Sequence, residues 1–365
     1  MGLILRQAGA IVLCLVGLYL VVLAAALALA PSPPDRRWLN TAHANDTIFM
    51  TQPKYIYLNR GVLRDPGEKV VVVGASNSVR GFTRAELGSF VPPRAVVHNF
   101  GLGGANMTEV RQVIDLVQEV QTAEARRRTI FVIGIWYGMF TEDRLRWFTP
   151  DRTPGDTDID IERYRYGFEW RTPSGPVALV SERYTDAAVT AIYPFLFLDK
   201  LARDATSLLA SHERPEVAIL DATVLTEEDR TKYLHYWASA MGPATRQSLD
   251  EQFDVLAQAC DAILSEGSQV VLVDLPLPKW HKDRSPYYRP FENQEARLVA
   301  EFRDRPGFRF VDLGRLDHDA DFIDEVHPKP RVTPTWSKEL ARALSPLLAP
   351  GMSLASSVSD KGPPP

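Results

Sequence analysis

Short apolar runs that alternate with helical patterns constrain the fold of this chain more than any other feature. Each run is rich in valine, isoleucine or phenylalanine and is bounded by glycine, proline or charged residues, as expected of buried strands. Strands that alternate with helices imply a parallel sheet with right-handed crossovers. The five predicted strands are Lys69–Ala75, Ala95–Phe100, Thr129–Ile135, Gln269–Leu275 and Phe308–Leu313.

Helical patterns fill the intervals between these strands. Apolar residues recur on one face from Met107 to Val120 and from Phe253 to Leu264, and Gly267 is a suitable helix end after the second pattern. Asn293–Phe302 and Pro334–Leu348 are two more predicted helices. We therefore expect a three-layer, flavodoxin-like α/β fold with five parallel strands in the order 2-1-3-4-5. Such sheets bind ligands beyond the carboxyl ends of their strands.

The N-terminus contains a charge-free stretch from Gln7 to Pro34. Its apolar core, Ala8 to Ala30, is 23 residues long, which suits a membrane-spanning helix and exceeds the usual apolar region of a cleaved signal peptide. Ala28 and Ala30 resemble a cleavage site, but a proline directly after the cut fits the peptidase poorly. We expect an uncleaved anchor over residues 1–34 with the remaining chain extracytoplasmic, either periplasmic or at the cell surface. A cleaved leader is the alternative.

The rest of the chain divides into a linker and lead-in (35–67), an α/β domain (68–349) and a disordered tail (350–365). Residues 138–248 interrupt the alternation after the third strand and form a predicted insertion that could cap the active site. Within it, Pro176–Leu209 and Thr226–Met241 have helical patterns.

Four acids in the insertion are spaced two residues apart, which is typical of one side of a strand. We expect a solvated strand face here, because the stretch lacks the glycine and distal glutamate of a calcium-binding loop. The four are Asp156, Asp158, Asp160 and Glu162.

Charge and cysteine content exclude several functional classes. A net charge of −5 argues against general nucleic-acid binding. Cys14 lies in the apolar leader and Cys260 on an apolar helical face, so neither a disulfide framework nor a cysteine-based metal site is expected. Gly101-x-Gly103 begins like a dinucleotide fingerprint, but Asn106 replaces the third glycine. We expect neither a metal nor a cofactor.

Chemically useful side chains follow all five predicted strands, at the edge where parallel strands place their carboxyl ends. The first strand ends in Gly-Ala-Ser and delivers Ser76, while Asp324 and His327 follow the fifth strand in DFIDEVHPKP. The second strand leads into the glycine-rich FGLGGANM, and the third and fourth lead into aromatic stretches. The other candidates at this edge are Gly104, Asn106, Trp136, Tyr137, Trp280 and His281.

These residue types suit nucleophilic catalysis. A serine hydroxyl needs a base to take its proton, and a neutral imidazole oriented by a carboxylate does so near pH 7. Asp324 and His327 are three residues apart, whereas His281, a rival base, has no carboxylate at that spacing. Backbone N–H groups of Ser76 and Gly104 could bind an oxyanion. The alternatives are a Ser76 that only caps a helix and a His327 that lies on the surface without a catalytic role.

The chain resembles the SGNH, or GDSL-type, hydrolase superfamily. Three blocks carry the resemblance: GAS at Gly74–Ser76, FGLGGAN at Phe100–Asn106 and DEVHP at Asp324–Pro328. The resemblance as a whole covers Lys69–Tyr137 and Ser248–Leu348 but not the insertion. The resemblance implies an SGNH hydrolase fold with Ser76 as nucleophile, His327 as base, Asp324 as its orienting carboxylate and Gly104 as an oxyanion donor.

Two departures from the family pattern bear on mechanism. The family has an acid before the serine, where this chain has Ala75. The third family block reads Gly-x-Asn-Asp, and its asparagine donates to the oxyanion. Here the block reads Gly-Ile-Trp-Tyr, so that donor is missing. Asn106 and the indole N–H of Trp136 are the candidates to replace it.

The anchor, the aromatic third block and LPLPKW after the fourth strand are similar to D-alanyl transfer proteins of teichoic acid synthesis and to SGNH-like proteins that O-acetylate exported polysaccharides. This similarity implies an esterase or O-acyltransferase that acts on acyl esters of a glycan, with a membrane-bound O-acyltransferase as a candidate partner. Trp136, Tyr137, Trp280 and His281 could line its substrate pocket, or the aromatic residues could belong to the core. The alternative function is a non-catalytic carbohydrate-binding or assembly protein.

Overall fold

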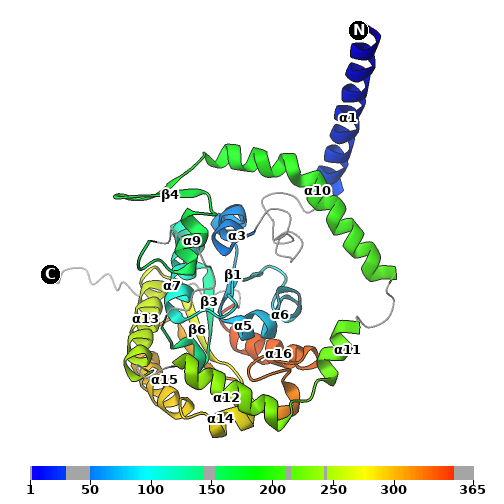
Figure 1. The fold of residues 1–365 in the computed structure, drawn as a ribbon. Helices are drawn as coiled ribbons and strands as arrows, with labels where there is room; N and C mark the ends of the chain where they lie inside the picture. Colours follow the sequence, from blue (N-terminus) through cyan, green and yellow to red (C-terminus); the bar gives the residue numbers. More distant parts are fainter. Residues whose placement is uncertain (1, 30–49, 143–152, 210–214, 242–244, 349–365) are drawn as a thin grey trace, which may run out of the picture.

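The computed structural model describes residues 2–29, 50–142, 153–209, 215–241 and 245–348 (Figure 1). Its centre is a five-stranded parallel sheet. The strands are β1 (Lys69–Gly74), β2 (Val96–Asn99), β3 (Thr129–Ile135), β6 (Gln269–Asp274) and β7 (Phe308–Asp312). The α/β class is therefore confirmed. The predicted tail 350–365 lies outside the described residues.

The strand order is β2-β1-β3-β6-β7, which differs in numbering from the predicted 2-1-3-4-5. The difference arises from a separate antiparallel hairpin that the sequence analysis did not predict, β4 (Glu169–Thr172) and β5 (Gly175–Ala178). This hairpin lies in the insertion and does not join the main sheet. Residues 176–178, predicted as the start of a helix, belong to it.

Alternate residues of β1 face opposite layers of helices. Val71 and Val73 pack into one apolar cluster, and Val70 and Val72 pack into the other. All four are fully buried, and each such burial contributes roughly 1.5–3 kcal/mol. The first layer contains α7 (Met107–Val120), α13 (Thr245–Ser265) and α15 (Tyr288–Phe302), and the second contains α5 (Ser76–Gly81), α6 (Arg84–Phe90) and α16 (Thr333–Leu344).

The described part of the lead-in packs onto this domain instead of forming a linker. It folds into α3 (Gln52–Leu58) and α4 (Arg60–Arg64). Tyr55, Ile56 and Leu63 are buried in the same cluster as α7. Two short helices elsewhere, α8 (Ala123–Arg127) and α14 (Lys279–Arg284), precede β3 and follow β6.

The insertion supplies α9 (Asp158–Tyr164), α10 (Glu182–Leu209), α11 (Pro215–Ala222) and α12 (Glu227–Met241). The predicted strand face of four acids is wrong, because most of this stretch is helix α9. Thr157 and Asp160 form a capping box: the threonine hydroxyl accepts from the Asp160 N–H at 3.2 Å, and the Asp160 carboxylate accepts from the Thr157 N–H at 3.1 Å.

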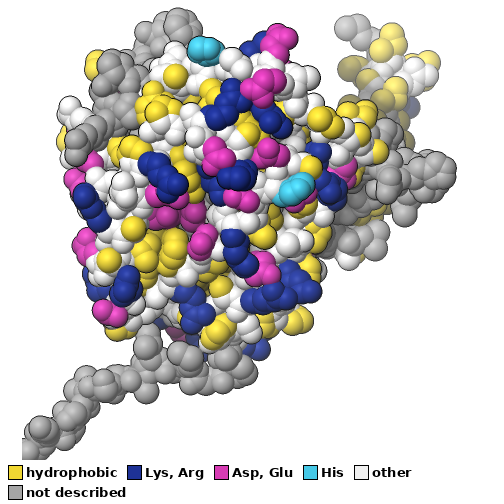
Figure 2. Space-filling model, turned by 90° about the horizontal axis from the view of Figure 1, so that it is seen from below, with side chains coloured by type: hydrophobic (Ala, Val, Ile, Leu, Met, Phe, Trp, Pro, Cys, Tyr) yellow, Lys and Arg dark blue, Asp and Glu magenta, His cyan; other side chains and the backbone are white. Residues whose placement is uncertain are grey.

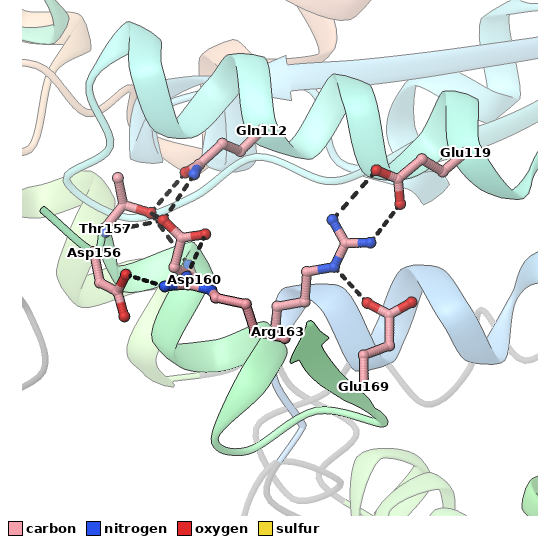
Figure 3. A network of polar contacts seen from close by, with 8 residues as sticks. Gln112, Glu119, Asp156, Thr157, Asp160, Arg163 and Glu169 are labelled. Atoms are coloured by element: carbon pink, nitrogen blue, oxygen red, sulfur yellow. Dashed lines mark hydrogen bonds and ion pairs between the residues drawn. The ribbon is translucent and has the colours of Figure 1, made fainter. Parts of the chain in front are cut away.

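Polar contacts tie α9 and the hairpin to α7 (Figure 3). Arg163 of α9 bridges Glu119 of α7, at 2.5 Å, and Glu169 of β4. Gln112 of α7 bonds both members of the capping box, Thr157 at 2.7 Å and Asp160 at 3.1 Å. This part of the insertion is therefore fixed to the α/β domain.

The N-terminal helix α1 (Gly2–Leu29) extends away from the domain (Figure 1). Residues Gly2–Ala28 have a mean hydropathy of 2.9, and only 6% of the most apolar window is buried. By length and composition this helix could cross a membrane or serve as a signal sequence. The cleavage position after Ala30 lies outside the described residues.

Candidate active site

The first strand delivers Ser76 to the carboxyl edge of the sheet through a turn that only glycine allows. Gly74 ends β1 with a φ of +137°. A Cβ on Gly74 would lie 2.3 Å from the hydroxyl oxygen of Ser78 and 2.5 Å from the carbonyl oxygen of Gly134. Ser76 is half-buried and begins α5, so its side chain is accessible at the strand tip.

Ser76, His327 and Asp324 form a continuous chain of hydrogen bonds. The Nε2 atom of His327 lies 2.7 Å from the Ser76 hydroxyl oxygen, although the two residues are 251 positions apart in sequence. The Nδ1 atom of His327 lies 2.7 Å from Oδ2 of Asp324. The structure therefore brings together the three residues that the sequence analysis singled out for nucleophile, base and orienting carboxylate.

The charge state of Asp324 suits an orienting role. Burial would raise the pKa of this carboxyl, but hydrogen bonds from the His327 side chain and from the N–H groups of Val326 and His327 outweigh burial, and its pKa lies below the ordinary value. An ionised Asp324 accepts the Nδ1 proton of His327. The Nε2 atom then has a lone pair facing the Ser76 hydroxyl, which is the tautomer that a general base requires.

The loop that carries Asp324 and His327 is closed by its own backbone. Phe322 and Pro328 form an antiparallel bridge, and the Ile323 N–H donates to the His327 carbonyl at 2.9 Å. Asp324 Oδ1 also accepts from the Val326 and His327 N–H groups at 3.0 and 2.8 Å. These bonds hold the carboxylate and the imidazole on one turn.

His281 is not placed as a rival base or as a substrate ligand. Its side chain is fully buried, and its Nδ1 donates to the Glu325 carbonyl at 2.8 Å while Nε2 lies 2.5 Å from the Tyr137 hydroxyl. Burial lowers the pKa of His281 to about 4. Both ring nitrogens are thus engaged, and His281 links the tip of β3 to the loop of Asp324 and His327.

The aromatic residues at the third and fourth strand tips lie in the interior, which supports the core alternative over a pocket lining. Trp136, Tyr137 and Trp280 are 4%, 0% and 5% exposed. Trp136 packs edge-on against Trp237 of α12, with ring centroids 4.6 Å apart. The Trp237 indole N–H donates to Glu325 at 3.2 Å, so the insertion contacts the loop of Asp324 and His327 through α12.

The glycine-rich turn after β2 lies beside the end of β1, two residues before Ser76. The Leu102 N–H donates to the Gly74 carbonyl at 2.8 Å, which continues the β1–β2 pairing to the strand tip. Gly104 is exposed and has a φ of +69°. A side chain there would have room but would be strained in this left-handed backbone. The turn is therefore positioned to offer a backbone N–H near the serine.

Asn99 holds this turn and α5 together, and the sequence analysis missed it. Its amide nitrogen donates to the Phe82 carbonyl at 2.7 Å at the end of α5, and its amide oxygen accepts from the Gly101 N–H at 3.0 Å. One side chain thus links the helix that begins at Ser76 to the glycine-rich turn. The signal available in the sequence was an asparagine at the end of a strand, directly before that turn.

Asn106, a candidate oxyanion donor in the sequence analysis, has a structural role at the start of α7. It is the N-cap of α7: its amide oxygen accepts from the Glu109 N–H at 3.1 Å, and its amide nitrogen donates to the Thr141 carbonyl at 3.2 Å. The side chain is 3% exposed. A helix that begins directly after a turn needs such a cap, which explains the asparagine here.

Comparison with known proteins returned structural matches only. No family model and no curated protein matches the sequence. One matching structure is a putative acylhydrolase from Bacteroides fragilis, with a TM-score of 0.38, 12% identity and coverage of 77% of this chain and 88% of that one. Another is a GDSL-like lipase from Bacteroides thetaiotaomicron, with a TM-score of 0.35, 11% identity and coverage of 82% and 93%. A third is TesA, with a TM-score of 0.34, 13% identity and coverage of 77% and 99%.

Similarity at this level does not transfer an activity to the chain. The side-chain geometry of the candidate site is therefore the basis for assigning a function. Among the described residues, no group of three histidine, cysteine or acidic side chains is arranged to hold a metal ion.

Proposed function

We propose that this protein is an SGNH-type serine esterase or O-acyltransferase that works through an acyl-enzyme on Ser76. The observation that carries the proposal is the pair of 2.7 Å contacts that joins Ser76 to His327 and His327 to Asp324. Nucleophilic catalysis requires a serine hydroxyl that is hydrogen-bonded to an imidazole nitrogen able to accept its proton, with the ring held in place by a carboxylate.

The reaction follows from these contacts. The Ser76 oxygen attacks the acyl carbonyl carbon while His327 Nε2 takes the hydroxyl proton, and the carbonyl oxygen becomes an oxyanion. Collapse breaks the bond to the leaving alcohol, which receives the proton from His327. Water or a glycan hydroxyl then attacks the acyl-enzyme with His327 as base, and Ser76 is restored.

The oxyanion site is the unusual part of this mechanism. The N–H of Ser76 lies in the first turn of α5, where it has no acceptor within the helix, and the turn at Gly104 supplies a second candidate donor. A third, side-chain donor is worth on the order of 3–4 kcal/mol in hydrolases that depend on it. The Trp136 ring packs in the core, but its indole N–H has no hydrogen-bond partner among the described residues, and we propose it as this donor.

The proposed substrate is an acyl ester of an envelope or exported polysaccharide. The proposal combines the candidate triad with α1 as an uncleaved anchor that keeps the α/β domain extracytoplasmic. A membrane-bound O-acyltransferase would supply the acyl group if the enzyme transfers it to a glycan. The non-catalytic alternative is less well supported, because a binding protein does not need the aligned Ser76, His327 and Asp324.

A fluorophosphonate probe tests the proposal, because only an activated serine reacts quickly with it. The wild-type protein should label, and Ser76→Ala should lose labelling by about four decades or more. Ser89→Ala is the matched control, because Ser89 is an exposed serine of α6 whose hydroxyl donates to the Glu86 carbonyl at 2.7 Å. Equal labelling rates of the wild-type and Ser76→Ala proteins, both with normal melting curves, would exclude Ser76 as the nucleophile.

A further inference from the structure

Helix α10 of the insertion packs against the apolar helix α1. The Tyr19 hydroxyl donates to the Ala191 carbonyl at 2.6 Å. Ala26 of α1 is fully buried in a cluster with Tyr193 and Phe197 of α10. The C-terminal part of α1 is therefore attached to the insertion. Helix α10 lies where α1 begins to extend away from the rest of the protein (Figure 1).

A stripe of α10 is both apolar and exposed. Tyr184, Phe195 and Leu198 are 71%, 62% and 50% exposed, although they are large and apolar. The stripe follows helical spacing and contains no charged residue. Its members are Tyr184, Ala187, Ala188, Ala191, Phe195 and Leu198.

The other faces of α10 have partners within the protein. Val189 and Leu196 pack with Leu58 of α3. The acidic residue Asp186 pairs with Arg60 of α4 at 2.8 Å, on the side of the domain. Apart from the contact of Tyr19 with the Ala191 carbonyl, the exposed stripe is therefore the face of α10 that the described residues leave uncovered.

The β4–β5 hairpin adds a second exposed apolar group on the same side of the molecule. Trp170 and Val177 are directly paired across the two strands and are 62% and 49% exposed. Figure 1 shows the hairpin and α10 along the side from which α1 extends. The face seen from the opposite direction carries interspersed side chains of both charges (Figure 2).

We propose that this surface, formed by the α10 stripe with Trp170 and Val177, lies on the lipid bilayer that α1 spans. The inference rests on the proposed membrane anchoring and extends it to the insertion. Exposed aromatic residues at the level of a membrane–water boundary, beside an uncharged helix face, are typical of an interfacial surface.

The length of α1 agrees with this placement. The part of α1 that precedes its contact with α10 runs from Gly2 to Leu18 and is exposed throughout. It carries one charge, Arg6, near its outer end, where a long side chain can reach the polar boundary. On this placement the membrane-spanning part is Gly2–Leu18 and not the Ala8–Ala30 expected from the sequence. At 1.5 Å per residue, about 17 residues span about 25 Å, close to the hydrocarbon thickness of a bilayer. The α10 stripe then lies at the boundary with the acyl chains. Anchoring the insertion there would hold the Ser76 edge at a fixed height above the membrane.

Depth-dependent quenching tests the proposal on the full-length protein. Val177→Cys and Phe195→Cys would each carry an environment-sensitive fluorophore in a Cys14→Ser background, since the other cysteine, Cys260, is fully buried. The proteins would be reconstituted into phosphatidylcholine–phosphatidylglycerol vesicles with and without doxyl-labelled lipids. Val224→Cys is the control. Val224 is 82% exposed, between α11 and α12, away from the side from which α1 extends (Figure 1).

We expect the lipid quencher to reduce the signal at residues 177 and 195 roughly twofold more than at residue 224. Equal quenching at all three positions, with the protein retained in the pellet after an alkaline carbonate wash, would refute the lipid-facing surface but not the membrane anchoring by α1. Protein released by the wash would refute both. Labels at 177 and 195 that are shielded from lipid quencher in native membranes would indicate a protein partner and also overturn the proposal. Fluorophosphonate labelling of Ser76 is independent of these outcomes.

Discussion

The Tyr137 hydroxyl donates a hydrogen bond to Nε2 of His281, at 2.5 Å, in the interior of the protein. The other ring nitrogen of His281 donates to the Glu325 carbonyl at 2.8 Å, one residue from Asp324. The tip of β3 thus supports the loop of Asp324 and His327 through a single neutral imidazole. This contact gives a structural reason for an aromatic residue at the tip of β3.

Buried His281 predicts that stability falls in mild acid. Its pKa is about 4 in the folded protein because of burial, against an ordinary value near 6.5. Between about pH 6.5 and pH 4 the unfolded chain therefore binds a proton that the folded protein does not, and the free energy of unfolding decreases as the pH falls through this window. The contribution is fully present above about pH 6.5, and its loss is on the order of 3 kcal/mol.

Urea unfolding of the wild-type protein and His281→Gln at pH 7 and pH 5 measures this contribution. The variant should be less stable at pH 7, and the difference between the two proteins should shrink at pH 5. Other titrating groups are common to both proteins and cancel in the comparison. A difference that stays constant with pH would show that His281 is not held neutral by burial.

Asn106→Ala should lower stability and leave chemistry nearly unchanged. Loss of the α7 cap should cost about 1 kcal/mol of unfolding free energy, while kcat per folded molecule stays near the wild-type value. Asn106→Asp keeps the accepting oxygen and should recover most of the stability. A fall in turnover of about two decades in Asn106→Ala with an unchanged melting curve would instead assign its amide to the oxyanion.

Trp136→Phe removes the unpartnered indole N–H while it keeps an aromatic ring in the core. If this N–H donates to the oxyanion, kcat should fall about 100-fold with little change in KM, because the contact forms only in the transition state. Trp280→Phe is the matched control, since its buried indole N–H is also without a partner among the described residues. Equal effects of the two substitutions would remove Trp136 from the mechanism.

Local patterns in the sequence determined the elements of the α/β domain. β3 and α7 occur at the predicted residues, because a run of buried β-branched residues and a one-sided apolar helix each depend on neighbours a few positions away. The strand prediction for the acid-rich stretch was wrong for a related reason. Spacing of two suggested a strand, but a local signal, the capping box of Thr157 and Asp160, favoured a helix.

The candidate site could be predicted as a set of residue types at strand tips, since parallel strands place their carboxyl ends at one edge. The roles of individual polar residues could not. Asn106 and His281 stand at strand tips just as Ser76 does, but one caps a helix and the other is buried against Tyr137. Burial and hydrogen-bond partners separate a structural role from a chemical one, and both depend on contacts between segments far apart in the chain.

The sequence by itself determined the α/β class, the apolar N-terminal helix, and the order of serine, glycine-rich turn, aspartate and histidine along the chain. Only the tertiary structure decided that His327 meets Ser76 across 251 positions. It also decided that α10 packs against α1, and that Trp170 and Phe195 stay exposed on that side. Periodicity reports which side of an element is apolar, but the partner that covers this side, or its absence, is decided when the whole chain packs.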